Sequence, residues 1–120
     1  MPFSVIDHVQ LAMPAGKEDE ARSFYAGMLG FVEIAKPAEL ASRGGAWFRS
    51  GDVAIHLGVD PEFRPARKAH PALRCDAYAD LLERLERSGV HVVRDDFPFE
   101  RRAHCYVADP FGNRLELIDG

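Results

Sequence analysis

The sequence predicts an α+β domain made of two copies of one β-α-β-β-β module. Three observations predict it: two similar strands that carry His8 and His70, a helical apolar stripe ending at a glycine after each strand, and a hairpin that closes each half. A chain of 120 residues forms one core of ordinary size, so both halves must share it. We expect a single domain over 1–120, divided into a first module at 3–58, a linker at 59–69 and a second module at 70–119.

The first half begins at residues 7–11, which alternate between polar and apolar side chains as a half-buried strand does. A helix is expected next, and Gly30 suits the left-handed position just after its end. The apolar stripe of this helix consists of Ala21, Phe24, Tyr25, Met28 and Leu29. A strand at 31–34 and a hairpin of 46–50 with 53–57 complete the module.

The second half repeats this order. A strand at 70–75 precedes a helix that we expect Asp76 to cap and Gly89 to follow. The stripe of that helix consists of Tyr78, Leu81, Leu82 and Leu85. A strand at 90–93 comes next, and a hairpin of 103–108 with 114–118 turns through the segment Asp109-Pro110-Phe111-Gly112-Asn113.

Charge and composition exclude several classes of partner. Fifteen basic and nineteen acidic residues give a net charge of −4, so we expect no attraction to nucleic acid. The chain has neither an apolar run of membrane-spanning length nor a recognisable signal segment, so we expect a cytoplasmic protein without membrane contact. Cys75 and Cys105 lie in apolar, strand-like segments and are expected to be reduced core residues.

The repeat places four potential metal ligands at equivalent positions. His8 and His70 lie in the first strand of each half, and His56 and Glu116 lie in the last. The separations are 48 residues from His8 to His56 and 46 from His70 to Glu116. Because neighbouring strand residues point to opposite faces, the apolar neighbours of each ligand can face the helices while the ligand faces the other side. We therefore expect one divalent-metal site formed by His8, His56, His70 and Glu116.

Imidazole and carboxylate ligands suit Zn²⁺, Ni²⁺, Mn²⁺ or Fe²⁺, and the sequence does not choose among these ions. The absence of thiolate ligands argues against a closed structural zinc site. An octahedral ion held by three or four of these residues keeps at least two open positions, where two oxygens of a substrate can bind.

Hairpin pairing predicts which side chains line the cavity. Pairing Ser50 with Val53 places Trp47 opposite His56, and the corresponding pairing in the second hairpin places Tyr106 opposite Glu116. We expect substrate-binding side chains at Trp47, Arg49, His104 and Tyr106. No catalytic residue is assigned, although Glu116 and Tyr106 are candidates. Phe97 and Phe99 are expected to cover the mouth of the cavity.

Taken together, these residues and motifs resemble the vicinal oxygen chelate superfamily. This family includes glyoxalase I, fosfomycin-resistance proteins, methylmalonyl-CoA epimerase, extradiol dioxygenases and the metal-free bleomycin-resistance proteins. The segments that carry the resemblance lie at 6–9, 23–25, 29–31, 70–73 and 109–116. The resemblance implies paired βαβββ modules that form a cupped sheet around one divalent metal ion. It also implies a homodimer whose metal ligands sometimes come from both chains.

His8, His70 and Glu116 match ligand positions of the metal-dependent members of that superfamily. His56 stands at the fourth position, where the resemblance to glyoxalase I would place a Glu active in proton transfer and the epimerase has Gln. The sequence therefore indicates a reaction other than that of glyoxalase I. We expect a glyoxalase-like lyase, isomerase or dioxygenase that acts on a small oxygenated metabolite or xenobiotic. The alternative is a non-catalytic binding protein of the bleomycin-resistance type.

Overall fold

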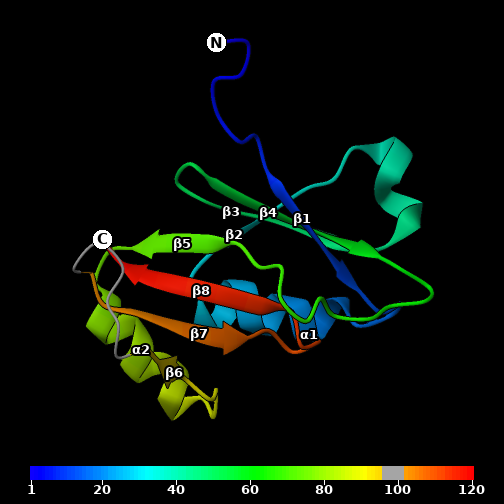
Figure 1. The fold of residues 1–120 in the computed structure, drawn as a ribbon. Coiled ribbons are helices and arrows are strands. Elements are labelled where there is room, and N and C mark those ends of the chain that lie inside the picture. The colour runs from blue at the N-terminus through cyan, green and yellow to red at the C-terminus, as the bar shows by residue number, and fades with distance from the viewer. Residues whose placement is uncertain (96–101) are drawn as a thin grey trace.

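Two four-stranded sheets with the same internal order form the computed structural model, which describes residues 1–95 and 102–120 (Figure 1). The first sheet has the order β1-β4-β3-β2, from β1 (Val9–Met13), β2 (Val32–Ile34), β3 (Ala46–Ser50) and β4 (Val53–Val59). The second has the order β5-β8-β7-β6, from β5 (Ala72–Cys75), β6 (Val93–Arg94), β7 (His104–Ala108) and β8 (Arg114–Asp119). The predicted repeat and fold class are therefore confirmed. Phe97 and Phe99 lie outside the described residues.

Both predicted hairpin registers are confirmed. Trp47 pairs with His56 and Ser50 with Val53, while Tyr106 pairs with Glu116. The first strand of each module pairs in parallel with the last, so Gln10 lies beside His56 and Ala72 beside Glu116. In both sheets this first strand is an edge strand.

Some element ends differ from the sequence-based expectation. The strand expected at 7–11 begins at Val9, and the strand expected at 70–75 begins at Ala72, so His8 and His70 both precede their strands. The strand expected at 90–93 is the short β6. A 3₁₀ helix, η2 (Ala38–Arg43), occupies the connection before β3.

One helix follows the first strand of each module. In the first module, α1 (Glu18–Arg22) continues without a break into η1 (Ser23–Met28), a π-helical turn that Gly30 follows at φ 80°. In the second, α2 (Tyr78–Arg87) is followed by Gly89 at φ 84°. The expectation that Asp76 caps this helix was wrong. Ala77, at φ 50°, is the residue before α2, and no side chain caps it.

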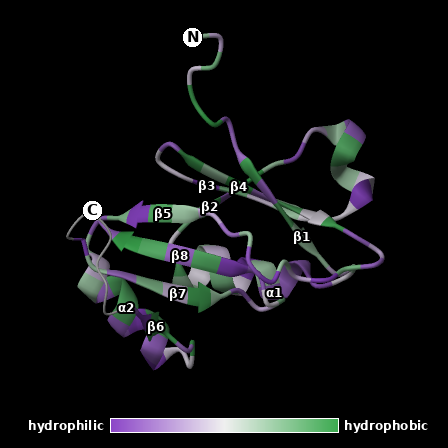
Figure 2. Cartoon of the chain, in the orientation of Figure 1, coloured by the Kyte–Doolittle hydropathy of each residue, from purple (hydrophilic) through white to green (hydrophobic). Residues whose placement is uncertain are grey.

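A single apolar core joins the two modules. Side chains from the helix-facing side of each sheet belong to one buried cluster, which includes Phe48 and Ile55 from the first module and Leu85 and Leu117 from the second. Figure 2 shows apolar and polar residues alternating along β8, where Leu115 and Leu117 are buried and Glu116 faces the other way. The expected parity is present in both sheets, so the candidate ligands lie on the faces without helices.

The turn between β7 and β8 fastens one module to the other. Tyr25 in η1 donates its hydroxyl hydrogen to Oδ2 of Asp109 at 2.7 Å. Oδ1 of Asp109 accepts bonds from the backbone N–H groups of Phe111 and Asn113, and the Asn113 side chain donates to the carbonyl oxygen of Ala12 in β1 at 2.8 Å. The most characteristic motif of the sequence therefore has a structural role between the modules.

Candidate metal centre

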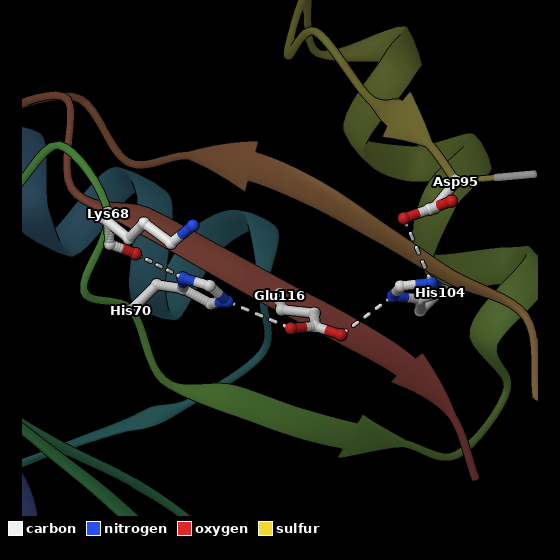
Figure 3. A network of polar contacts seen from close by, with 5 residues as sticks. All are labelled: Lys68, His70, Asp95, His104 and Glu116. Carbon is white, nitrogen blue, oxygen red and sulfur yellow. Dashed lines mark hydrogen bonds and ion pairs between the residues drawn. The ribbon is translucent and has the colours of Figure 1, made fainter. Parts of the chain in front are cut away.

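A chain of polar contacts crosses the second sheet on the face without helices. Glu116 lies on β8 between two histidines, with its Oε1 3.0 Å from Nε2 of His70 and its Oε2 2.8 Å from Nδ1 of His104 (Figure 3). Nε2 of His104 lies 3.4 Å from a carboxylate oxygen of Asp95. Nδ1 of His70 lies 2.7 Å from the carbonyl oxygen of Lys68.

These contacts influence the charge of Glu116. Burial raises the pKa of the Glu116 carboxyl, but the hydrogen bonds from His70 and His104 lower it by more, so the net pKa lies below its ordinary value. The carboxylate form is therefore favoured, and this is the form that binds a cation.

The carbonyl oxygen of Lys68 decides which ring nitrogen of His70 is available to a metal ion. A carbonyl oxygen cannot donate a hydrogen, so Nδ1 of His70 must carry one and donate it to Lys68. This leaves Nε2, the atom next to Glu116, as the nitrogen that can bind a metal ion, which would take the place of the hydrogen that Nε2 shares with the Glu116 carboxylate. An outer oxygen acceptor that fixes the ring in this way is the usual surrounding of a metal-binding histidine.

A stack of three rings occupies the corresponding face of the first sheet. The ring of His56 lies between Trp47, at a centroid distance of 3.9 Å and an interplanar angle of 6°, and His8, at 4.0 Å and 16°. Nδ1 of His8 lies 2.7 Å from Oδ1 of Asp7, so an oxygen acceptor orients His8 as Lys68 orients His70. His8 and His70, which both precede the first strand of their module, therefore direct Nε2 away from their outer partner.

Burial, together with the charge of a neighbouring ring, favours a neutral His56. Burial lowers the pKa of the His56 ring most, and the neighbouring His8 lowers it further. A neutral imidazole retains the lone pair that a metal or a proton needs.

The predicted substrate residue Arg49 lies on the same face, but its guanidinium donates to the carbonyl oxygen of Gly51 in the hairpin turn at 3.3 Å.

Tyr106 is half-buried on the face of the second sheet that carries Glu116. Its ring makes edge contacts with His70 at 5.5 Å and with His104 at 5.7 Å. The guanidinium of Arg114 lies over the ring, 4.1 Å from its centroid. Tyr106 thus lies beside the candidate ligands, as the hairpin register predicts.

The structure divides the predicted quartet into two pairs. His8 and His56 are neighbours on the first sheet, and His70 and Glu116 are neighbours on the second. Within residues 1–95 and 102–120, no three His, Cys, Asp or Glu side chains are placed to hold one metal ion. Both pairs lie on faces turned away from the shared core, so the single chain presents two separate pairs of candidate ligands.

Two cavities lie close to these residues. One of about 770 Å³ is lined by Tyr106 and Arg114 together with Phe24 and Met28 of the first module, although neither His70 nor Glu116 lines it. The other, of about 480 Å³, lies between residues 9–12 of β1 and His70. The hydrogen-bonded pair of His70 and Glu116, and not the larger cavity, carries the side chains that can bind a metal ion.

The residues present fit a divalent metal ion as two halves. Two donor atoms bound to one ion at about 2.0–2.2 Å lie roughly 3 Å apart when they are adjacent in its coordination shell. The 3.0 Å separation of His70 Nε2 and Glu116 Oε1 agrees with that spacing. Three imidazoles and one carboxylate form a donor set suited to a borderline-soft ion.

Sequence reasoning missed four partners of these ligands. Arg114 is two residues from Glu116 on the same strand face, so parity alone would have found it. Asp7 is the neighbour of His8 and could have been noticed as its carboxylate partner. The carbonyl of Lys68 and the side chain of Asp95 carry no sequence signal, because their placement depends on the linker path and on the register of β6.

The two modules, with histidines and a glutamate on the sheet faces opposite the helices, define the class of protein as a paired-module α+β fold with candidate metal ligands on two faces. The chain belongs to the Glyoxalase/Bleomycin resistance protein/Dioxygenase superfamily, whose family model matches residues 5–117. Members of this superfamily generally use a divalent metal ion, bind small molecules and often form dimers.

Solved structures agree with this assignment. A glyoxalase family protein from Bacillus anthracis is 43% identical, covers 98% of this chain and 96% of its own, and has a TM-score of 0.93. A fosfomycin resistance protein from Listeria monocytogenes shares the fold at 16% identity, with a TM-score of 0.78 and coverage of 98% of this chain and 94% of its own.

A curated relative, glyoxylase I 4 from Arabidopsis thaliana, is 32% identical over 84 residues, or 63% of this chain. The chain spans about half of that relative's length, 48%. In the part of the chain that the structure describes, no helix is both long enough and apolar enough to cross a membrane.

Proposed function

We propose that this protein is a homodimeric, divalent-metal-dependent enzyme of the lyase, isomerase or dioxygenase type that acts on a small oxygenated substrate. Each metal site takes His8 and His56 from one chain and His70 and Glu116 from the other. The observation that carries the proposal is the pair of half-sites: each holds two potential ligands, and each first-strand histidine has its Nδ1 engaged by an outer oxygen.

A second chain supplies what one chain lacks. In each chain the two pairs lie on separate sheets that share a core on their opposite faces. A twofold dimer can face the first sheet of one chain with the second sheet of its partner and thereby form two identical sites. Such a dimer would also cover the apolar side chains of Phe3, Val5 and Ile6, which are exposed in the single chain just before His8.

The proposed chemistry depends on the residues around the ion. A bound divalent ion supplies a Lewis acid for two substrate oxygens. Tyr106, next to His70, is placed to hydrogen-bond a substrate or to take part in proton transfer. His56 is favoured as a neutral imidazole, so it can either bind the ion or accept a proton. A reaction that uses an imidazole at this position differs from one that uses a Glu.

A second candidate function is capture of a ligand without chemistry, as in a resistance protein of the bleomycin-resistance type. The stacked rings of Trp47, His56 and His8 favour it, because such a stack offers an aromatic surface for a flat ligand. Ligand binding that is equally tight before and after metal removal would support this candidate.

The first experiment measures metal per chain in protein purified without added metal. We expect His70→Ala and Glu116→Gln to lose the metal. His91→Ala, which changes an exposed histidine outside the site, should retain it. Equal metal content in the wild type and both ligand variants would refute the proposed site.

The second experiment tests whether each site draws on two chains. One chain carries His8→Ala with His56→Ala, and a differently tagged chain carries His70→Ala with Glu116→Gln. Neither homodimer has a complete site, but a mixed dimer has one intact and one doubly defective site. We expect it to recover about half of the wild-type metal per dimer. No recovery would mean that each site forms within one chain.

A further inference from the structure

We infer that His104 is a positioning residue that holds the carboxylate of Glu116 ready for the metal, and that Asp95 supports His104 in turn. This inference rests on the proposed function, because it concerns the same metal site. It assigns His104 a role through Glu116 in place of the substrate contact expected from the sequence.

The contacts of His104 argue for this role. Its side chain is 5% exposed, and both of its ring nitrogens face carboxylates, with Nδ1 2.8 Å from Glu116 and Nε2 3.4 Å from Asp95. A ring engaged on both edges has little freedom to reach a substrate. The backbone N–H of Asp95 also donates to the carbonyl oxygen of His104 at 3.2 Å, so main chain and side chain hold the two residues together.

The two oxygens of Glu116 have separate partners. Oε2 faces His104, whereas Oε1 faces Nε2 of His70, the nitrogen available to the metal. An N–H bond to Oε2 restricts rotation of the carboxylate and leaves Oε1 toward the ion. Outer partners of this kind typically strengthen metal binding by about 10–100-fold, because the ligand is already oriented when the ion arrives.

The repeat supports the same reading. Tyr106 in the second module corresponds to Trp47 in the first, since each lies opposite the last-strand ligand. Two residues earlier the second module has His104 and the first has Gly45. The extra histidine is therefore present only in the module whose last-strand ligand is a carboxylate.

The test uses variants that keep or remove the donor to Glu116. His104→Asn places an amide N–H near the position of Nδ1, and His104→Leu has a similar volume without a donor. Asp95→Asn weakens the support of His104, and Glu116→Gln removes the ligand itself. Co²⁺ is the probe, because its affinity and its visible absorption report on the coordination of the ion.

We expect His104→Leu to weaken Co²⁺ binding by about 10–100-fold and to change the visible spectrum. His104→Asn should restore most of the affinity, and Asp95→Asn should lower it by a smaller factor. Two results would overturn the inference. One is Co²⁺ binding by His104→Leu that equals the wild type, and the other is equal weakening by the Asn and Leu variants, which would indicate a structural role alone.

Metal-free protein provides a separate readout. The ring nitrogen resonances of His104, followed by ¹⁵N NMR, should shift in Glu116→Gln if the hydrogen bond exists without metal, and an unchanged spectrum would contradict the inference. The melting temperature of each variant with and without Co²⁺ separates folding defects from binding defects. Failure of the wild type to bind Co²⁺ would instead refute the proposed function, so the two failures are distinguishable.

Discussion

The hydroxyl of Tyr25 joins the two modules through Asp109. Tyr25 is fully buried and Asp109 is 5% exposed, so this bond lies away from water. Burial raises the pKa of the Tyr25 hydroxyl, with the charge of Asp109 as the next cause, which keeps it a hydrogen donor at every ordinary pH. The bond therefore secures the relative placement of η1 and the turn before β8.

Tyr25→Phe should lower the free energy of unfolding by about 1.5–3 kcal/mol, because it leaves a buried carboxylate with one donor fewer. Chemical denaturation with urea measures this loss. Asp109→Asn provides the second arm of a double-mutant cycle, and the two changes should be coupled by about 1 kcal/mol or more. Strictly additive effects would show that the hydroxyl and the carboxylate do not depend on each other.

Cys75 provides a prediction that depends on pH. Burial raises the pKa of its thiol to about 11, and the thiol donates to the carbonyl oxygen of Leu73. In a Cys105→Ser background at pH 8, alkylation of Cys75 should be about 100-fold slower than for a thiol of pKa 9 and should accelerate toward pH 11. Since the folded pKa is raised, the associated stability is complete below pH 9 and is lost as the pH rises through about 11. Rapid alkylation at pH 8 would contradict the expected burial.

The hairpins were predictable from sequence because turn chemistry and side-chain alternation specify register locally. This places Trp47 opposite His56 and Tyr106 opposite Glu116. The first strands were less predictable at their starts, because the parallel pairing of β1 with β4 begins at Val9 and is set by a distant segment. The same limitation applies to β6, whose short pairing with β7 cannot be inferred from its own apolar run.

Gly45, the residue before β3, has no room for a larger side chain. It lies just before β3 at φ 84°, and an added Cβ would lie 2.1 Å from the carbonyl oxygen of Leu57. Gly45→Ala should therefore destabilise the fold by more than about 2 kcal/mol, since β3 or β4 must move. Gly51→Ala is the matched control: its φ of 57° is also positive, but nothing lies within 4 Å of the added atom, so about 1 kcal/mol is expected. Equal thermal unfolding of the two variants would show that backbone angle alone determines the loss.

The repeat predicted which four residues group together as candidate ligands. It did not predict how the two pairs lie relative to each other in space. Sequence equivalence groups His8, His56, His70 and Glu116, but it says nothing about which chain brings the two pairs together. One apolar core places the helix-facing sides of both sheets in a single cluster, and the ligand faces are left on the other sides. Such an arrangement depends on how the modules pack, which no local pattern encodes. The bonds of Asp109 to Tyr25 and of Asn113 to Ala12 contribute to this packing, because each joins one module to the other.

The segment before β1 relates the proposed dimer to the proposed metal site. The segment before His8 extends away from both sheets (Figure 1). Within this segment the exposed fractions of Phe3, Val5 and Ile6 are 91%, 84% and 78%. Apolar side chains exposed together usually mark a surface that another chain covers. Because His8 follows Ile6 by two residues, a partner that covers this segment also lies close to a proposed ligand.

Replacing Phe3 and Ile6 by Asp should therefore weaken the dimer by at least about 10-fold and reduce metal content together with it, because charged side chains cannot be buried as apolar ones are. Sedimentation velocity over a range of protein concentrations measures association, and metal analysis of the same samples measures the site. Ala79→Asp is the control, since Ala79 is exposed on α2, the helix that lies on the other side of the second sheet from the candidate ligands. Loss of metal without a change in dimer affinity would mean that the segment orients His8 but does not contribute to dimerisation. An unaffected dimer that retains its metal would instead exclude Phe3 and Ile6 from both roles.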